Sequence, residues 1–498
     1  MNENLPVNLY RAAQVRELDR VAIEEAGIAG FELMQTAAKA ALQYLLVVYP
    51  SPEKITVFCG TGNNGGDGYV MAALAMQAGI DVEVIECGET GKIQGDALLA
   101  RQLAVVEGVC FSGFDAQRVF SQGVIVDALL GTGLSGVVRG EFMQAIQSIN
   151  RSACPVLAVD IPSGLCSDSG CVLGDGVYAE HTVSFIGLKQ GLLTGAGPDY
   201  TGSIHYADLS VPLWVFERVM ASSERLDLAA LKLALPARKR SAHKGRFGHV
   251  MVTGGDLGMA GAALMASQAA CRVGAGLTSC LTRTEHIAAL VSRCPEVMAH
   301  GVVSGQEAGL KMAAASVVVI GPGLGRSAWS EQLLQQALQL TQPLVVDADA
   351  LNMIAAGRVV KNPYRDNWIL TPHPGEAARL LDCSVADIER DRFAAVTALQ
   401  ARYGGAVILK GAGTLVADAE NDLVGLCPYG NPGMATGGMG DVLSGVLGAL
   451  LAQGLGVATA ARLGVCLHAC AGDLAAQQDG QRGLLATDLI AYLRRLVN

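Results

Sequence analysis

The sequence has few charged residues, few aromatic residues and no long uninterrupted hydrophobic run. Charged residues make up 16% of the 498 residues and aromatic residues 5%, whereas hydrophobic residues make up 51% and glycine occurs 61 times. This composition excludes a disordered chain and a collagen-like fibre, and it is typical of α/β enzymes. A chain of this length is expected to form two or three domains, each large enough to bury its own core.

A surplus of basic residues is also absent. The 36 Lys and Arg residues against 46 Asp and Glu residues give a net charge of -10, which leaves no broad basic face for a nucleic-acid backbone or an anionic membrane. The most hydrophobic stretch, residues 442–461, contains Ser444, Gln453 and four glycines and directly follows Asp441, which favours a buried helix over a membrane span. We therefore expect neither nucleic acid nor a membrane as a partner.

The cysteines form no Cys-X-X-Cys pair, although there are 13 of them. The sequence begins MNENLPVN, without a basic segment followed by a hydrophobic one, so we expect a reduced protein in the cytoplasm. The spacing nearest to that of a metal site is found at Cys466, His468 and Cys470. On a helix the two cysteines share a face while His468 points elsewhere, which favours a buried hydrophobic helix.

Short hydrophobic runs that end in glycine or aspartate alternate with longer Ala/Leu-rich stretches in both halves of the chain. This alternation predicts β-α-β units around mostly parallel sheets. The first series consists of KITVFCG, DVEVIECG, GVIVDALLG, PVLAVDIPSG and HTVSFIG, and the second of HVMVTGG, GLTSCLTR, SVVVIGPGLG, PLVVDADAL, NWILTPH and AVILKGAGT. A charged stretch without glycine, about residues 217–240, separates them. We place the boundary near residue 225, which predicts two unlike domains, 1–225 and 226–498.

A glycine-rich loop, residues 61–68 (TGNNGGDG), follows the first predicted strand. Its four glycines let the backbone approach a ligand closely, and the helix that follows offers free N–H groups to an anion. A tight turn would need only one glycine, and Asn63, Asn64 and Asp67 have no obvious packing role. We interpret this loop as a phosphate-binding site.

A second glycine-rich loop, residues 131–136 (GTGLSG), has the spacing GxGxxG of a dinucleotide-binding fingerprint. The first loop upstream and the position of Asp127 just before these glycines argue against an ordinary dehydrogenase. Asn64, Asp127 and Ser163 are oxygen donors expected at neighbouring strand ends, a set that suits K⁺. A role of these donors in capping loops remains the alternative.

These motifs, with the VDIPSG that contains Asp160, resemble the N-terminal domain of the NAD(P)H-hydrate epimerases over roughly residues 10–215. The resemblance implies a Rossmann-like three-layer α/β/α domain, a hydrated dinucleotide bound by the two loops and by Asp160, and K⁺ bound by Asn64, Asp127 and Ser163. The implied substrate-binding residues are Asn63, Asn64, Gly65, Gly66, Asp67, Gly131, Thr132, Gly133, Leu134, Ser135, Gly136, Val137 and Asp160.

The most distinctive segment of the second half is residues 430–441 (GNPGMATGGMGD), which leads into a hydrophobic helix. Glycines at a helix N-terminus can form an anion hole for a transferring phosphoryl group, and Asp441 can accept the proton of an attacking hydroxyl. A helix cap would need the aspartate but not the five surrounding glycines. The segment resembles the C-terminal signature of the ribokinase-like superfamily, with GMGD where its kinases have GAGD.

Three further strand ends carry polar or glycine-rich motifs. They are IGPGLG ending at Gly325, TPHPGE around His373, and KGAGT from Lys410. Prolines on both sides of His373 favour a rigid loop that directs its side chain into a cleft, although a structural role is the alternative. Asp347 and Asp349 of DADALN fit either caps at the sheet end or contacts to metal or substrate.

Together with HKGRFGHV and GMAGAA, these motifs resemble the ADP-dependent NAD(P)H-hydrate dehydratases from about residue 240 to the end. The resemblance implies a ribokinase-like α/β domain that uses ADP and Mg²⁺. The resemblance does not decide which alanine of residues 261–263 contacts the substrate, and we assign Ala262. The implied substrate-binding residues are Ala262, Gly325, His373 and Asp441, and the implied nucleotide-binding residues are Lys410, Gly411, Ala412, Gly413, Thr414 and Gly440.

With both domains in this order, the whole chain resembles the bifunctional NAD(P)H-hydrate repair enzymes. The resemblance implies that the first domain epimerises the R and S hydrates of NADH and NADPH, with Asp160 handling the proton. The second domain would dehydrate the S form at the expense of ADP through a phosphorylated intermediate, with Asp441 as base and AMP and phosphate as products. The alternative is a ribokinase-like small-molecule kinase with a non-catalytic, ligand-binding N-terminal domain. The choice between ADP and ATP and the oligomeric state, a homo-oligomer included, remain open.

Overall fold

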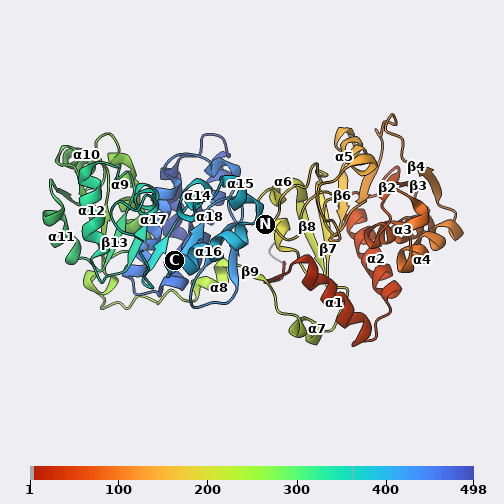
Figure 1. Ribbon diagram of the computed structural model, residues 1–498, viewed down its shortest axis with the longest axis horizontal. Coiled ribbons are helices and arrows are strands. Elements are labelled where there is room, and N and C mark those ends of the chain that lie inside the picture. Colours follow the sequence, from red (N-terminus) through yellow and green to blue (C-terminus); the bar gives the residue numbers. More distant parts are fainter. Residues whose placement is uncertain (1–4, 362) are drawn as a thin grey trace. The chain divides into compact units, whose positions relative to one another are not determined.

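The computed structural model describes residues 5–361 and 363–498, and the chain divides into two compact units between Glu224 and Arg225. The first four residues of the N-terminal stretch MNENLPVN lie outside the described residues. Red to yellow elements belong to the first unit and green to blue elements to the second (Figure 1). Each unit is an α/β structure with its own sheet and its own hydrophobic core.

The first unit contains these helices and strands: β1 (Asn8–Leu9), α1 (Ala12–Glu24), α2 (Gly30–Val48), β2 (Ile55–Cys59), α3 (Asn63–Gln77), β3 (Val82–Glu86), α4 (Gly95–Val106), β4 (Cys110–Gly113), β5 (Val124–Ala128), α5 (Gly140–Arg151), β6 (Val156–Val159), β7 (His181–Phe185), α6 (Gly197–Thr201), β8 (Ser203–Ala207), α7 (Leu213–Arg218) and β9 (Ser223–Arg225). Short 3₁₀ turns lie at Thr90–Lys92 and Gln190–Leu193.

The main sheet of the first unit is parallel throughout, in the order β4-β3-β2-β5-β6-β7-β8. The chain moves outward in one direction from β2 and in the other direction from β5, so the order reverses between these two neighbours. The loops that follow β2 and β5 therefore diverge and leave a crevice at the carboxyl ends of the strands, where open α/β sheets bind ligands. β1 and β9 pair antiparallel and do not belong to this seven-stranded sheet.

Successive residues of each central strand face opposite layers of helices. Ile55 and Val57 of β2 pack in a cluster with α1, α2, α3 and α4, whereas Phe58, between Val57 and Cys59, packs with α5 on the other face. The sheet is thus buried on both faces, which explains why its strands read as continuous hydrophobic runs in the sequence. The first unit is a three-layer α/β/α structure.

The second unit contains these helices and strands: α8 (Leu228–Lys232), β10 (His249–Thr253), α9 (Ala260–Val273), β11 (Leu277–Thr282), α10 (Ile287–Arg293), β12 (Met298–Gly301), α11 (Gly305–Ala313), β13 (Val317–Ile320), α12 (Ala328–Leu338), β14 (Leu344–Val346), α13 (Ala348–Ala355), β15 (Trp368–Leu370), α14 (Pro374–Leu381), α15 (Val385–Arg390), α16 (Arg392–Tyr403), β16 (Ala406–Leu409), β17 (Thr414–Ala417), β18 (Val424–Cys427), α17 (Met439–Ala452), α18 (Val457–Asp479) and α19 (Leu489–Leu496). Short 3₁₀ turns lie at Lys244–Phe247, Thr284–His286, Pro432–Met434 and Ala486–Asp488.

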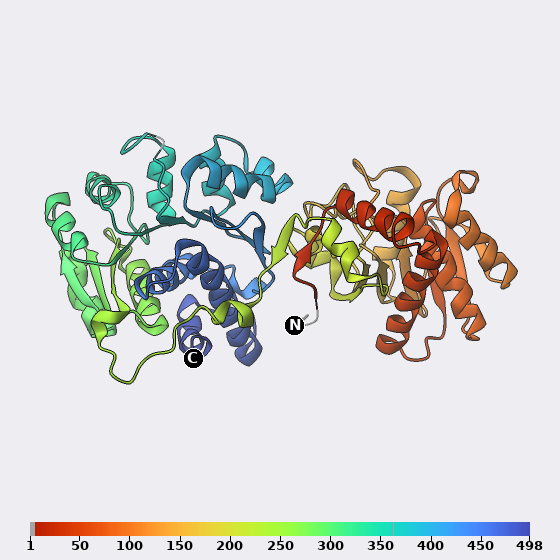
Figure 2. The ribbon, with the colours of Figure 1, turned by 90° about the horizontal axis from the view of Figure 1, so that it is seen from below.

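The strands of the second unit follow the order β18-β17-β16-β15-β14-β13-β10-β11-β12. All neighbours from β16 to β12 in this order are parallel, whereas β17 runs antiparallel to both β16 and β18. The C-terminal helices, drawn in blue, cover one side of this sheet, and the helices drawn in teal cover the other (Figure 2). The order reverses between β10 and β13, which again directs ligands to the carboxyl ends of the strands.

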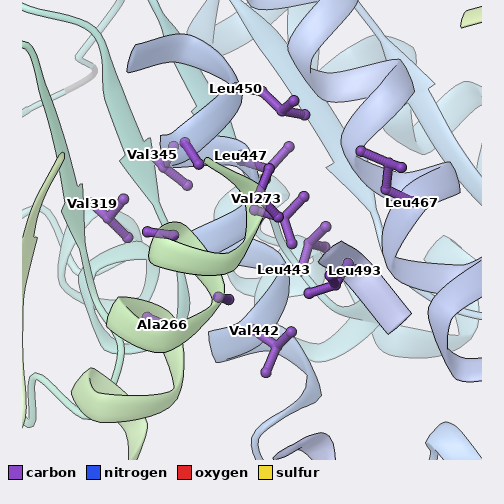
Figure 3. Packing of buried hydrophobic residues seen from close by; sticks show 14 of the residues in the cluster. Ala266, Val273, Val319, Val345, Val442, Leu443, Leu447, Leu450, Leu467 and Leu493 are labelled. Carbon is purple, nitrogen blue, oxygen red and sulfur yellow. The ribbon is translucent and has the colours of Figure 1, made fainter. Parts of the chain in front are cut away.

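The core of the second unit lies between α9, α17 and the sheet. Ala266 of α9 and Leu443 and Leu447 of α17 pack against strand residues such as Val319 and Val345 (Figure 3). Small residues let the two helices approach closely, because the Cβ of an alanine at Gly445 would lie 2.9 Å from the Cβ of Ala269. This packing fixes α17, and with it the position of its first turn at the sheet edge.

The strands predicted from the hydrophobic runs are confirmed, and they correspond to β2, β3, β5, β6 and β7 in the first unit and to β10, β11, β13, β14, β15 and β16 in the second. Residues 442–461 lie in the buried helix α17 and at the start of α18. Cys466, His468 and Cys470 are all buried in α18. Among the described helices, none has the length and hydrophobicity that a membrane crossing requires.

Candidate active sites

The first unit has a cavity of about 550 Å³ at the carboxyl ends of its strands. The loop after β2, the loop after β5 and Asp160 after β6 all line it, as the reversal of strand order between β2 and β5 leads one to expect. The predicted residues on its wall are Asn63, Asn64, Asp67, Gly131, Thr132, Gly133, Leu134, Ser135 and Asp160. The structure thus brings together two glycine-rich loops that lie far apart in the sequence.

Four of the predicted binding residues lie off the cavity wall. Gly65 and Gly66 are buried in the first turn of α3, and a Cβ at Gly66 would lie 2.6 Å from the Cε atom of Met34. These two glycines allow close packing of the helix. Gly136 and Val137 are exposed beyond the lining part of the second loop.

Asp127 and Ser163 form a fully buried pair behind the cavity. The Ser163 hydroxyl donates to Asp127 Oδ1 at 2.6 Å, and the Ser163 amide donates to Oδ2 at 2.8 Å. The amide of Leu130 donates to the Ser163 hydroxyl at 2.8 Å, so the pair fixes the start of the second loop. Burial raises the pKa of Asp127 to about 6, although these hydrogen bonds oppose the rise.

The side-chain amide of Asn64 is buried but has neither a donor nor an acceptor partner within the described residues. Only 8% of Asn64 is exposed, and it contacts the second loop closely, because a Cβ at Gly131 would lie 3.2 Å from its Cβ. Leaving a buried amide without a hydrogen bond costs about 1 to 3 kcal/mol. The arrangement therefore points to a bound group that Asn64 contacts.

Asp160 is held in an unusual backbone conformation with φ of 67°, which non-glycine residues rarely adopt outside functional sites. Its carboxylate forms an ion pair with Lys189. The Lys189 side chain is 1% exposed, and its ammonium also donates to Ser184 Oγ at 3.2 Å and to the Phe185 carbonyl at 3.0 Å. A fully buried lysine thus fixes the Asp160 carboxylate on the cavity wall.

Two further carboxyl groups, Asp19 and Asp67, line the same cavity. Burial raises the pKa of Asp19 to about 6, and the charge of Asp160 adds to this rise while Lys189 opposes it. The pKa of Asp67 lies well above the ordinary value because of burial and the nearby charges of Asp160 and Asp19. Burial and these charges thus favour the protonated form of Asp67.

In the second unit, the GGMGD segment forms the first turn of α17. Gly438 is the N-cap with φ of 94°, and the helix begins at Met439. Asp441 therefore lies in the first turn, where the free N–H groups of a helix accept an anion. Burial raises the pKa of Asp441 to about 7, and the charges of Asp347 and Asp349 contribute while Lys410 opposes the rise.

Asp347 and Lys410 form an ion pair beside Asp441. The Lys410 ammonium lies 2.9 Å from Asp347 Oδ1, and this carboxylate also accepts hydrogen bonds from Thr371 at 2.7 Å and Ser444 at 2.9 Å. Burial alone would raise the pKa of Asp347, but Lys410 and the two hydroxyls lower it below the ordinary value. A Cβ at Gly440 would lie 3.3 Å from the Lys410 ammonium, so the pair lies directly against the first turn of α17.

His373 caps the N-terminus of α14 and remains half-exposed. Its Nδ1 accepts a hydrogen bond from the Gly375 amide at 3.0 Å, and its own amide donates to Glu376 Oε2 at 2.8 Å. Burial lowers the pKa of His373, and the charges of Lys410 and Arg379 lower it further, so the ring is neutral at neutral pH. Glu376 Oε2 lies 3.9 Å from the Lys410 ammonium, which links this loop to the Asp347 pair.

The predicted substrate residues Ala262 and Gly325 lie at the reversal between β10 and β13. Ala263 is completely buried, whereas Ala262 is partly exposed and faces the loop after β13, where a Cβ at Gly323 would lie 3.0 Å from its own. Gly325 adopts φ of 70° and donates its amide to Asp349 Oδ2 at 2.9 Å. Of the two alanines, Ala262 is therefore the accessible one.

The segment from Lys410 to Thr414 joins β16 to β17. Gly411 adopts φ of 142°, and a Cβ there would lie 2.7 Å from the guanidinium of Arg392, so this position requires glycine. Gly411 and Ala412 are exposed, and the Thr414 hydroxyl donates to the Gly411 carbonyl at 3.0 Å. The exposed backbone of this turn and the buried Lys410 ammonium thus face different surroundings.

Sequence reasoning missed several residues that complete these clusters. Lys189 and Asp19 belong to no motif, and only the fold brings them to Asp160. Glu376 and Ser444 were inside or next to quoted motifs, but neither was singled out. Within the described part of the chain, no three His, Cys, Asp or Glu side chains gather closely enough to hold a metal ion by themselves.

Two family models match the chain. One described as YjeF-related protein N-terminus matches residues 30–191, and one described as NAD(P)H-hydrate dehydratase matches residues 250–495. Among curated proteins, the bifunctional NAD(P)H-hydrate repair enzyme Nnr of Coxiella burnetii is 47% identical over 98% of this chain and 99% of its own length. That of Escherichia coli is 43% identical over 99% and 95%, and the bifunctional NAD(P)H-hydrate repair enzyme of Leishmania major is 39% identical over 98% and 93%.

Solved structures resemble the second unit. A ribokinase-like superfamily protein of Enterococcus faecalis is 31% identical, covers 55% of this chain and 94% of its own length, and has a TM-score of 0.50. A Bacillus subtilis protein described as an ADP/ATP-dependent NAD(P)H-hydrate dehydratase, co-crystallised with ATP and Mg²⁺, is 29% identical, covers 54% and 96%, and has a TM-score of 0.49. The predicted fold class, a three-layer α/β/α unit followed by a ribokinase-like unit, is confirmed.

Proposed function

The chain belongs to the family of bifunctional NAD(P)H-hydrate repair enzymes, and from this premise we propose that its two units catalyse two successive repair reactions. The first, residues 1–225, epimerises the R and S hydrates of NADH and NADPH. The second, residues 226–498, dehydrates the S hydrate at the expense of ADP. This division is supported by the ionisable side chains, because each unit has its own cluster of them at the carboxyl ends of its strands.

In the first unit, the two glycine-rich loops hold the dinucleotide and Asp160 reaches the hydrated carbon. The hydrate carries its hydroxyl on the carbon next to the ring nitrogen, so loss and return of that hydroxyl interconverts the epimers. Asp160 lines the cavity and is fixed by Lys189, which suits a group that exchanges a proton with the reacting oxygen. Asn63 and Thr132 line the same cavity and support binding of the remainder of the dinucleotide.

We assign K⁺ to the loop junction formed by Asn64, Asp127 and Ser163. The fit rests on the buried Asn64 amide, which has no partner among the described residues, and on the oxygen donors of Asp127 and Ser163 behind it. A monovalent cation bound there would supply positive charge and fix both glycine-rich loops. The protein side of this site is the hydrogen-bonded pair of Asp127 and Ser163, which already orders the start of the second loop.

In the second unit, Asp441 is the base that takes the proton of the substrate hydroxyl as that oxygen attacks the phosphoryl group. The raised pKa of about 7 places its proton affinity near the operating pH. Lys410, held by Asp347, supplies positive charge beside the first turn of α17. Phosphorylation turns a poor leaving group into a good one, and loss of phosphate together with a proton from the neighbouring ring carbon then restores the ring double bond.

The nucleotide contacts are Lys410 to Thr414 and Gly440, and Mg²⁺ accompanies the nucleotide. Mg²⁺ in such sites usually takes one or two carboxylates and completes its coordination with phosphate oxygens and water, which agrees with the few carboxylates near Asp441. Bound Mg²⁺ would neutralise the charge that develops on the transferring phosphoryl group. Ala262, Gly325 and His373 form the substrate side of this site.

One experiment tests the proposal as a whole. Full-length protein is incubated with hydrated NADH and either ADP or ATP while the absorbance of reduced nicotinamide is followed. We expect both epimers to be converted to NADH with ADP, with the R form delayed by its epimerisation. A stable phosphorylated product without recovery of NADH would instead identify a small-molecule kinase, the alternative reading of the second unit.

A further inference from the structure

The cavity of the first unit contains more ionisable groups than a dinucleotide-binding crevice needs. Five different parts of the fold contribute them, namely α1, α3, α4 and the segments after β6 and β7, and one of the groups is an exposed arginine. The charged or ionisable side chains on the wall are Arg16, Asp19, Asp67, Asp96, Asp160 and Lys189. Acidic groups outnumber basic ones on this wall, which suits a reaction that passes through a positively charged centre.

Lys189 is committed entirely to the protein. Its three ammonium contacts are the Asp160 carboxylate, the Ser184 hydroxyl and the Phe185 carbonyl, which use its three N–H donors. With a side chain that is 1% exposed, Lys189 has no proton free for a ligand. It therefore acts on Asp160 alone, by fixing the orientation of that carboxylate.

Asp67 is in the opposite situation. It lines the cavity from α3, just after the first turn of that helix, yet the described residues offer its carboxyl group neither a hydrogen bond nor an ion pair. Burial and the nearby charges of Asp160 and Asp19 keep its pKa well above the ordinary value. One cavity thus contains a carboxylate paired with a lysine and a second carboxyl group whose pKa is raised, and such pairs divide acid and base roles in enzymes.

We propose that Asp67 is the acid and Asp160 the base of the epimerisation, and that Lys189 is the positioning residue that orients the Asp160 carboxylate. This assignment rests on the epimerase function proposed above. It adds the acid and the positioning residue to a reaction for which sequence analysis named Asp160 alone.

The assignment gives a balanced sequence of steps. Asp67 transfers its proton to the hydroxyl oxygen, the C–O bond breaks, water leaves, and the lone pair of the ring nitrogen forms the C=N bond of an iminium ion. Water then adds to the other face, the C=N pair returns to nitrogen, and Asp160 takes the proton that the water oxygen loses. Proton exchange with solvent returns both groups to their starting states. The carboxylates of the wall stabilise the iminium ion.

Three full-length variants test the assignment: Asp67→Asn, Lys189→Met and Lys189→Arg. Epimer exchange of hydrated NADH is measured by chromatography without ADP, as kcat/KM across pH. Wild type should lose activity as pH rises through the pKa of Asp67. Asp67→Asn should lose roughly a hundredfold or more in rate and no longer show this decline. Lys189→Met should lower kcat/KM for epimer exchange, because it releases the Asp160 carboxylate from its fixed position, and Lys189→Arg, which keeps a cation beside Asp160, should restore kcat/KM in part.

Dehydration of the S hydrate with ADP, measured in the same samples, reports that the second unit is intact. Full exchange activity in Asp67→Asn, or an unchanged kcat/KM in Lys189→Met, would overturn the assignment of acid and positioning residue. If Lys189→Met and Lys189→Arg lost activity equally at every pH, Lys189 would have a purely structural role. Absence of epimer exchange in wild type would instead refute the epimerase function itself.

Discussion

The two units place the same three chemical groups at the carboxyl ends of sheets with different strand orders. In the first unit, Lys189 pairs with Asp160, and Asp67 has no ion-pair partner among the described residues. In the second unit, Lys410 pairs with Asp347, and Asp441 in the first turn of α17 likewise has no ion-pair partner within the described part of the chain. Each unit therefore has a carboxylate whose charge is stabilised by a lysine and a second carboxyl group whose pKa is raised.

The difference lies in which carboxyl group meets the substrate and in which protonation state. The paired Asp160 lines a cavity, whereas the paired Asp347 is buried and both its oxygens are occupied by Lys410, Thr371 and Ser444. In the proposed mechanism, the group with the raised pKa is an acid in the first unit and a base in the second unit. From this comparison we infer that a lysine–carboxylate pair beside a second carboxyl group can support opposite proton transfers. The direction depends on whether the paired carboxylate lines the cavity, as Asp160 does, or is buried, as Asp347 is.

The largest expected effect is the loss of one activity without the other, caused by a single substitution in the second unit. Asp441→Ala should lower dehydration by roughly a thousandfold or more, because a positioned general base contributes up to about 10⁴-fold, while epimer exchange stays within about twofold of wild type. Both rates are measured on one preparation of the full-length variant. Loss of both activities together would mean that the units do not carry separate active sites.

The converse substitution, Asp160→Asn, keeps the size of the side chain but removes its ability to take a proton. We expect epimer exchange at saturating hydrate to fall roughly a hundredfold, with affinity for the hydrate largely retained and dehydration of the S form unaffected. If Asp160 instead only bound the ribose, the variant would bind hydrate more weakly and turn over normally when saturated. Chromatography of the epimers at saturating hydrate distinguishes these results.

The central strands of both sheets could be predicted from the sequence because burial on both faces makes them continuous hydrophobic runs. Edge strands could not: β4 is exposed along most of its length and β12 begins with the exposed Met298. Neither has a hydrophobic run, and tertiary pairing alone defines them. The antiparallel β17 and β18 were missed because the repeating β-α-β pattern ends before them.

The candidate sites show the same limit. Glycine-rich loops and Asp441 are visible because their chemistry requires several unusual residues within a short segment. Lys189 lies in an ordinary hydrophobic segment after β7, and Asp19 lies in α1 far from every motif. Only the strand order that places β7 beside β6 brings Lys189 to Asp160.

A smaller effect is expected on stability when the lysine of the second unit loses its partner. Asp347→Asn leaves the Lys410 ammonium without its main counter-charge, and breaking a buried pair from one side costs about 3 to 5 kcal/mol. We expect the free energy of unfolding of the second unit to fall by an amount of this order, measured by denaturant titration. Asp349→Asn, at a partly exposed carboxylate nearby, is the matched control and should change it by less than about 1 kcal/mol. Equal effects would contradict the special role of the Asp347 pair.

The smallest expected effect concerns the loop junction that exists only in the first unit. Gly131→Ala would bring a methyl group to 3.2 Å from the Cβ of Asn64, which should displace its amide and raise the K⁺ concentration needed for half-maximal epimer exchange several-fold. Gly113→Ala, where no atom lies within 4 Å of the added methyl group, is the control. Asp127→Ala should have the same direction and a larger effect. Exchange that is independent of K⁺ in wild type would refute the cation site.

The most direct test of opposite proton transfers is the pH dependence of the two reactions, measured as kcat/KM on one preparation of wild-type protein. Asp441 must lose its proton to act as a base, and its pKa is raised to about 7, so dehydration should increase as pH rises through about 7. Asp67 must keep its proton to act as an acid, and its pKa also lies above the ordinary value, so epimer exchange should decrease as pH rises through that pKa. The account would be contradicted if epimer exchange rose together with dehydration as pH increases and never declined.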